Sequence, residues 1–272
     1  MELERIIEIT KANLCGLDAK KHSVDTRRSA HIRELGLVLA TYLPEKGEDF
    51  EYIRHRYSQT AAELHLSAEE CVILCRVIAG KFGDIQDFIP LFSAKRRCRI
   101  SYVKNPLSDL AYDSFSLYFD RAEVSYADDF VSAAEDVYHS VSDYVILPVY
   151  SEKGGRLKSF CDLADKYEMK KVLSCSVYSN TEDTETEFVL FSKNCERFSG
   201  NRRKEVFFEF SVPDTDILDC TEYVRQTDSR IVQINTNEER AYICLEISES
   251  EISALYLYLM LHLPGHEIKG IY

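Results

Sequence analysis

Thiol and imidazole side chains follow one another closely in one stretch of the chain, where they could bind a metal ion. His65 precedes Cys71 and Cys75, and the two cysteines are separated by one helical turn. A closed zinc site needs four ligands, usually in tighter pairs, so these residues alone do not complete one. We therefore expect the thiols to pack in a hydrophobic core, and the sequence predicts no metal and no other cofactor.

The remaining cysteines show no spacing typical of a disulfide framework. The chain has nine cysteines, an odd number, and none of them forms a Cys-x-x-Cys pair. This usage indicates reduced thiols that pack as small hydrophobic side chains. The sequence also contains no glycine-rich phosphate loop, no nucleophile elbow and no His-Glu-x-x-His motif.

Residues 57–67 have the cadence of the first part of a helix-turn-helix motif, which would suit a transcriptional role. The following helix should then present basic or amide side chains to the base edges. It offers Glu69, Glu70 and a single Arg76 instead. This pattern favours an ordinary helix pair, and a protein-interaction or transcriptional module remains an alternative.

Size and charge narrow the classes of partner. The chain has 272 residues and a formal net charge of -13, enough for two or three domains. Residues 1–97 hold 15 basic and 15 acidic residues, so the remaining 18 basic and 31 acidic residues account for the whole net charge. Such acidity repels a phosphate backbone, which makes nucleic acid an unlikely partner.

Neither a membrane span nor a secretory signal is expected. The longest apolar runs, at 144–150 and 255–263, are much shorter than the roughly 20 residues that cross a bilayer. The first residues are acidic and amphipathic, whereas a secretory signal begins with a basic segment before its apolar run. We expect a cytoplasmic protein that does not bind membranes.

Three segments with different periodicity predict three domains. Residues 1–97 have helical spacing, with a stripe at Ile32, Leu35 and Leu39 and a capping box at Ser67 and Glu70. In residues 98–198 strands alternate with helices, which predicts an α/β domain with a largely parallel sheet. Residues 199–272 have the order β-α-β-β-α-β, typical of a ferredoxin-like fold, with a second capping box at residues 248–251.

The last two segments resemble the prephenate dehydratase family. Residues 143–155 are similar to the family's D-Y-x-V-L-P-I-E-N-S-x-x-G segment, and residues 186–188 fall on its Thr-Arg-Phe motif. Residues 268–272 are similar to the K-V-L-G-x-Y ending of the ACT regulatory domain that follows in that family. The resemblance implies a lobe like those of periplasmic binding proteins, followed by an ACT-like domain.

The resemblance also implies a site. Thr186 would be the catalytic hydroxyl, and Tyr150, Ser151 and Phe188 would lie against the ligand. Glu187, however, occupies the position of the family's arginine, which supplies positive charge for a dicarboxylate substrate. Only about ten residues, 178–187, separate the preceding strand from Thr186, too few for the family's second lobe.

The ACT-like segment implies a second candidate site. In the family, a turn after the first strand and the end of the second strand bind phenylalanine at a dimer interface. The residues at these positions here are Asp216, Ile217, Leu218, Asn235 and Thr236. The turn lacks the family's glycine and carries two carboxylates, which disfavour an amino acid's carboxylate.

Together these observations predict a diverged, non-catalytic relative that regulates or senses a small ligand in aromatic amino-acid metabolism. Its expected partners are an amino acid or aromatic carboxylate and a second copy of the chain, bound through the ACT-like domain. The first alternative is an active prephenate dehydratase that converts prephenate to phenylpyruvate. The second is an interaction module formed by the N-terminal helices.

Overall fold

The computed structural model describes residues 24–41, 57, 59–82, 92–93, 97–179, 183–198, 205–236, 239–263 and 265–272. The chain divides into two compact units, residues 1–90 with 210–267 and residues 91–209 with 268–272. Each unit therefore combines segments that are far apart in the sequence. The three domains expected from the sequence, at residues 1–97, 98–198 and 199–272, remain a prediction. Within the predicted helical segment 1–97, residues 1–23, 42–56, 58, 83–91 and 94–96 lie outside the described residues.

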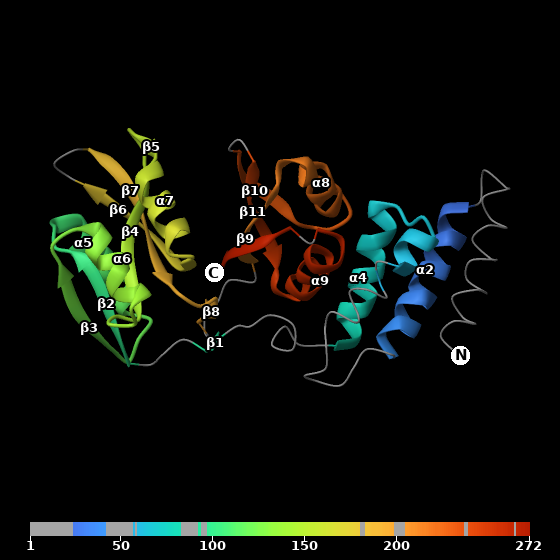
Figure 1. Ribbon diagram of the computed structural model, residues 1–272, viewed down its shortest axis with the longest axis horizontal. Helices are drawn as coiled ribbons and strands as arrows, with labels where there is room; N and C mark the ends of the chain where they lie inside the picture. Colours follow the sequence, from blue (N-terminus) through green and yellow to red (C-terminus); the bar gives the residue numbers. More distant parts are fainter. Residues whose placement is uncertain are drawn as a thin grey trace. The chain divides into compact units, whose positions relative to one another are not determined.

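The first unit packs helices against an antiparallel sheet (Figure 1). Its described N-terminal helices are α2 (Val24–Thr41) and α4 (Ala68–Phe82). The later segment begins in strand β9 (Glu205–Pro213) and continues through a 3-10 turn, η2 (Asp214–Asp216), to α8 (Ile217–Arg225), β10 (Arg230–Thr236) and β11 (Arg240–Ser248). A second 3-10 turn, η3 (Glu249–Glu251), precedes α9 (Ile252–His262), and the following strand, β12 (Glu267–Ile271), lies almost entirely in the second unit.

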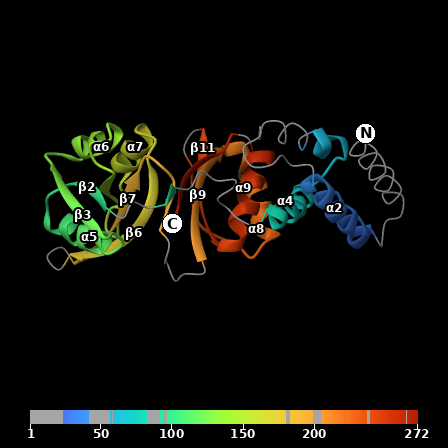
Figure 2. The same ribbon diagram turned by 90° about the horizontal axis from the view of Figure 1, so that it is seen from below.

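The order of these C-terminal elements is the predicted β-α-β-β-α-β order. Within the first unit, β11 lies between β9 and the edge strand β10. Helices α8 and α9 lie on one face of these strands, and α4 packs against both helices on their far side (Figure 2). Nine residues of α9 are buried, on all sides of the helix, because α4 covers the surface that the sheet leaves open.

Helix α4 begins as the sequence predicts. The Ser67 N–H donates to Glu70 Oε2 over 2.9 Å, and the Glu70 N–H donates to Ser67 Oγ over 3.3 Å, which is the reciprocal capping box. Glu70 also forms an ion pair with Arg28 of α2. The capping box expected at Ser248 and Glu251 is wrong, because the Ser248 hydroxyl bonds to Ser250 Oγ and η3 intervenes before α9.

The second unit is a mixed α/β sheet with helices on both faces. Its strands are β2 (Arg97–Val103), β3 (Arg121–Ala127), β4 (Tyr144–Ser151), β5 (Gly155–Arg156), β6 (Lys170–Ser179) and β7 (Thr184–Ser192). Its helices are α5 (Pro106–Ser116), α6 (Phe130–Tyr138) and α7 (Lys158–Lys166). Two further short strands, β1 (Phe92–Ser93) and β8 (Glu196–Arg197), form a separate parallel pair.

The strand order of this unit is β12-β6-β7-β4-β2-β3, with β5 paired to β4. Strands β2, β3 and β4 are parallel, as predicted, whereas β7 runs antiparallel to both β4 and β6. The short connection between β6 and β7 explains the difference, because a hairpin joins antiparallel strands and a parallel crossover needs a longer connection.

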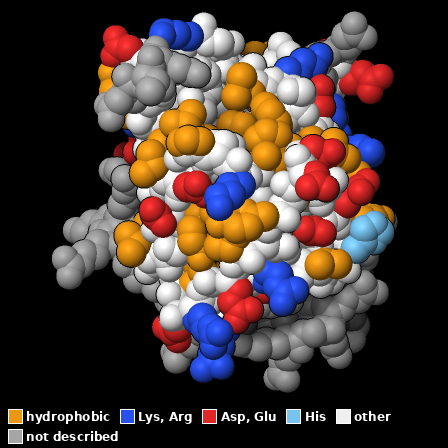
Figure 3. All heavy atoms as spheres, turned by 90° about the vertical axis from the view of Figure 1, so that its left-hand side faces the viewer, with side chains coloured by type: hydrophobic (Ala, Val, Ile, Leu, Met, Phe, Trp, Pro, Cys, Tyr) orange, Lys and Arg blue, Asp and Glu red, His pale blue; other side chains and the backbone are white. Residues whose placement is uncertain are grey.

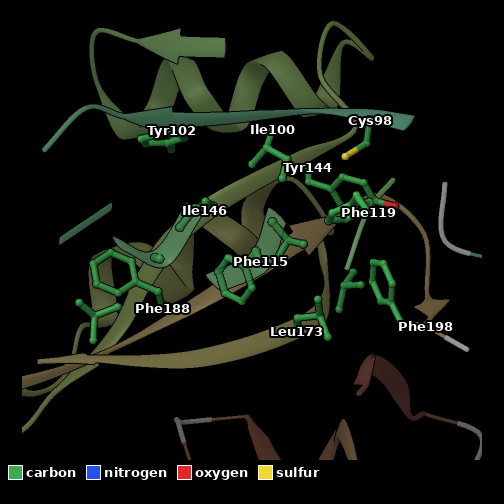
Figure 4. Close-up of a cluster of buried hydrophobic side chains, with 14 residues drawn as sticks. Cys98, Ile100, Tyr102, Phe115, Phe119, Tyr144, Ile146, Leu173, Phe188 and Phe198 are labelled. Carbon is green, nitrogen blue, oxygen red and sulfur yellow. The ribbon is translucent and has the colours of Figure 1, made fainter. Parts of the chain in front are cut away.

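Two hydrophobic clusters fix the faces of this sheet. Tyr144 and Ile146 of β4 point into a cluster with Phe115 of α5 (Figure 4). Val145 and Leu147 point into the other cluster, which contains Ala133, Val137 and Ala164 from α6 and α7. Alternate residues of one strand thus enter opposite cores, which places α5 and α6 on opposite faces of the sheet.

Strand β3 forms an edge of the second unit. Nearby elements expose apolar side chains, including Leu117, Tyr118 and Tyr126, which are 85%, 48% and 55% exposed. On the corresponding side of the molecule, apolar side chains form several small patches separated by charged ones (Figure 3). Charged residues such as Arg121 and Glu123, which form an ion pair on β3, are typical protection for an edge strand.

Candidate functional site

The topology of the parallel strands in the second unit indicates where a ligand site is expected. Strand β2 is the first strand of this sheet, and the chain adds β3 on one side of it and β4 on the other. Because α5, which follows β2, and α7, which follows β4, pack on opposite faces of the sheet, the two connections diverge at the carboxyl ends of β2 and β4. In open α/β sheets, ligands bind in the crevice outside such a switch point. The carboxyl end of β4 is Tyr150 and Ser151.

The four residues predicted for the dehydratase-like site lie near this end of β4, but they do not all share one face of the sheet. Ser151 lies directly opposite Thr186 of β7 in the antiparallel ladder, and Tyr150 lies opposite Glu187. Thr186 is 8% exposed and Tyr150 is 44% exposed. Phe188, the fourth, is 3% exposed and belongs to the core cluster on the α5 face (Figure 4). The ladder therefore pairs Ser151 with Thr186 on one face, leaves Tyr150 on the other, and buries Phe188 in the core.

The same ladder defines a second row of side chains on the opposite face. Residues directly opposite in neighbouring strands share a face, so Tyr150 of β4, Glu187 of β7 and Ser176 of β6 form one row across three strands. Ser176 is exposed and Glu187 is partly buried. We call these three residues the cross-strand row. Sequence patterns gave no signal for Ser176, because its position depends on the β6–β7 hairpin.

Glu187 is an ionisable group in an unfavourable setting for its charge. Burial raises the pKa of the Glu187 carboxyl above its ordinary value, Lys171 opposes this effect, and the carboxylates of Glu209 and Glu185 add to it. Lys171 already binds Glu209 through a 2.6 Å contact between its Nζ and Oε2. The lysine that opposes this shift is therefore also paired with another carboxylate.

A second ion pair and a thiol complete the polar surface beside the row. Lys269 Nζ lies 3.0 Å from Asp165 Oδ1, and the Arg156 Nε–H donates to Cys161 Sγ over 3.3 Å. Interaction with Cys161, Glu209 and Asp165 raises the pKa of Arg156, although burial opposes this shift. Sequence reasoning missed this set, because β9 and β12 bring Glu209 and Lys269 from distant parts of the chain.

The two helices that begin at this end of the sheet, α5 and α6, are capped by the side chains of the residues directly before them. Asn105 Oδ1 accepts the N–H groups of Leu107 and Ser108 at the start of α5, over 3.1 and 2.9 Å. Asp129 Oδ1 accepts the Ser132 N–H of α6 over 2.7 Å, and this bond holds the pKa of Asp129 below its ordinary value. Helix N-termini bind anions through free N–H groups, and these donors are already engaged.

The five residues of the ACT-like candidate site lie at one end of the sheet of the first unit. Asp216 ends η2, Ile217 and Leu218 begin α8, and Asn235 and Thr236 end β10. Strand β11 separates the two groups, with Asn235 and Thr236 opposite its first residues. Leu218 is 78% exposed, and Asp216 Oδ1 accepts the Thr215 hydroxyl over 2.9 Å. This end of the sheet therefore presents carboxylates, as the sequence indicates.

The thiols predicted to pack in a core do so. Cys71 and Cys75 are 1% and 0% exposed, and the Tyr57 hydroxyl lies 3.8 Å from Cys75 Sγ. Across the described ranges, no group of three or more histidine, cysteine or acidic side chains is arranged to hold a metal ion. In the same part of the chain, no helix is both long and apolar enough to cross a membrane.

Helix α4, which would be the recognition helix of a helix-turn-helix motif, is mostly committed to packing. Cys71, Leu74 and Ile78 are buried, and the helix contacts α2, α8 and α9. Its Arg76 Nη2 donates to Glu251 Oε1 over 2.8 Å. These contacts give no support to contact with DNA bases through α4.

Comparisons with known proteins identify the fold of the chain and no family by sequence. No protein-family model and no curated protein matches it. The prephenate dehydratase from Streptococcus mutans matches with a TM-score of 0.51 and 12% identity, over 64% of this chain and 97% of that chain. The prephenate dehydratase from Arthrobacter aurescens in complex with L-Phe gives 0.49 and 10%, over 64% and 89%. The quorum quenching acylase GqqA gives 0.47 and 14%, over 64% and 94%.

The chain therefore has a diverged prephenate dehydratase-like fold, which confirms the resemblance found in the sequence. The similarity to the Streptococcus mutans structure, at 12% identity, extends to the fold and does not establish a shared chemistry.

Proposed function

We propose that this chain is a non-catalytic relative of the prephenate dehydratases that binds a small ligand and serves a regulatory or ligand-sensing role in aromatic amino-acid metabolism. The observation that carries the proposal is the charge beside Thr186. Glu187 lies where the family resemblance implies an arginine, and it is a partly buried carboxylate near Glu185 and Glu209. A dicarboxylate substrate would meet like charge in a partly desolvated setting, where repulsion is stronger than in water.

The chain between the two strands of the site supports the same conclusion. Dehydration of prephenate needs a proton donor for the leaving hydroxyl and a site closed from water. From Ser151 to Thr184, the chain forms β5, α7 and β6, which pair with or pack on the sheet of the second unit. In the described part of residues 91–209, the segment between these strands thus packs on the same sheet, which supports a single lobe without an opposing lobe over Thr186.

Turnover of prephenate tests this proposal. Purified protein and a Thr186→Ala variant are incubated with prephenate at neutral pH, and phenylpyruvate is followed against a protein-free blank. We expect both proteins to match the blank. Formation of phenylpyruvate by the wild type, abolished in Thr186→Ala, would show an active dehydratase and overturn the non-catalytic assignment.

A further inference from the structure

The cross-strand row offers three recognition groups that fit one ligand chemistry. Tyr150 presents a half-exposed aromatic ring, Glu187 presents a carboxylate and Ser176 presents an exposed hydroxyl. Neighbouring strands lie about 4.8 Å apart, so the three side chains can reach one small group between them. A carboxylate, a hydroxyl oxygen and an aromatic face all favour a bound cation.

Glu187 shares the cation that interacts with it, Lys171, with the carboxylate of Glu209. Lys171 is bound by Glu209 at 2.6 Å, and Lys269 is bound by Asp165 at 3.0 Å. The charge of Arg156 interacts with Glu209 and Asp165. The remaining charge near the row, from Glu187 and Glu185, is negative.

We propose that the cross-strand row binds the ammonium group of a small primary amine that has an apolar body. Glu187 accepts charge-assisted hydrogen bonds from the ammonium, Ser176 accepts a further one, and the Tyr150 ring covers the ligand. This inference rests on the proposed ligand-binding function and names its ligand class. It assigns the opposite charge to that of the dicarboxylate implied by the sequence resemblance.

A pair of probes with matched shape and opposite charge tests this assignment. Phenethylamine and 3-phenylpropionate are each titrated into the full chain by isothermal calorimetry at pH 7. We expect phenethylamine to bind and 3-phenylpropionate not to bind. Glu187→Gln keeps the shape of the side chain and removes its charge, so it should weaken phenethylamine binding at least tenfold, whereas Ser176→Ala should weaken it less.

Glu168→Gln is the matched control, because Glu168 is exposed in the turn after α7 and lies outside the row. It should leave the affinity for phenethylamine unchanged. Binding of phenethylamine that Glu187→Gln does not weaken would overturn the assignment to the row.

Other outcomes separate this inference from the proposed function. Binding of 3-phenylpropionate in place of phenethylamine would overturn the amine assignment and leave a non-catalytic ligand-binding protein. Absence of binding by both probes would also overturn it. Failure of the non-catalytic assignment has its own readout, which is prephenate turnover that depends on Thr186.

Discussion

At the scale of single residues, the replacement of a cation by Glu187 has consequences for stability as well as for binding. The raised pKa of Glu187 means that the folded state disfavours its charged form more than the unfolded chain does. Stability from this group is fully present below the ordinary carboxyl pKa, and it is lost as the pH rises through the raised folded value.

The first prediction follows from this sign. Glu187→Gln removes the ionisation that burial opposes, so the variant should have a higher thermal unfolding midpoint than the wild type at pH 7. The difference should disappear near pH 4, where the wild-type carboxyl is protonated. Thermal unfolding followed by circular dichroism at the two pH values checks this. An equal or lower midpoint for the variant at pH 7 would show that Lys171 compensates the charge.

Two buried thiols and one partly buried thiol give the second prediction. Burial raises the pKa of Cys175 to about 11, of Cys195 to about 11 and of Cys220 to about 12. Because the thiolate is the reactive form, these thiols should react with iodoacetamide at pH 8 more than about 100-fold slower than an unperturbed thiol. Peptide mass spectrometry of the labelled native protein measures this, with the protein unfolded in urea as control. Rapid native labelling of all three would contradict the burial shown here.

At the scale of elements, the periodicity of the sequence predicts most of the helices and strands but not their partners. The alternation of strands and helices predicted for residues 98–198 and the β-α-β-β-α-β order predicted for residues 199–272 both match the observed order, because their longer elements have a clear apolar period or a cap. The Ser248 prediction is wrong because local spacing does not determine whether an α-helix or a 3-10 turn begins. The antiparallel placement of β7 and the approach of Glu209 to Lys171 depend on long-range pairing, which a single sequence does not encode locally.

Two helical glycines give the third prediction, at the contact between α2 and α4. A Cβ at Gly36 would lie 2.9 Å from Val77 Cγ1 and 3.1 Å from Leu74 Cδ1, whereas a Cβ at Gly80 meets nothing within 4 Å. Gly36→Ala should therefore destabilise the protein by about 1–3 kcal/mol through overpacking. Gly80→Ala, the matched control, should stabilise it by about 1 kcal/mol through helix propensity.

Urea unfolding measures both free energies. Stabilisation by both alanine substitutions would mean that α2 and α4 do not pack as closely at Gly36 as the structure shows.

At the scale of the whole molecule, the exposed edge of the sheet bears on how the protein assembles. The C-terminal β-α-β-β-α-β segment keeps an exposed edge at β10, where Val232 and Ile234 are 47% and 38% exposed. Unpaired edge strands are templates for pairing with another chain. We therefore propose that a second copy pairs along β10, in accord with the dimer predicted from the sequence.

The fourth prediction concerns this dimer. Sedimentation equilibrium should give twice the 31.4 kDa chain mass for the wild type. Val232→Lys places a charge on the edge and should shift the protein toward monomer, whereas Val131→Lys, at an exposed position of α6, should not. A monomeric wild type at micromolar concentration would contradict pairing along β10.

The central claim is that the cross-strand row on β4, β7 and β6 binds a cationic small ligand and not a dicarboxylate. The most direct measurement is a nuclear magnetic resonance titration of the isotope-labelled chain with phenethylamine, with backbone amides assigned. Our account predicts the largest shifts at Tyr150, Ser176 and Glu187. Shifts confined to residues 214–218 and 235–236, or no shifts at all, would contradict it.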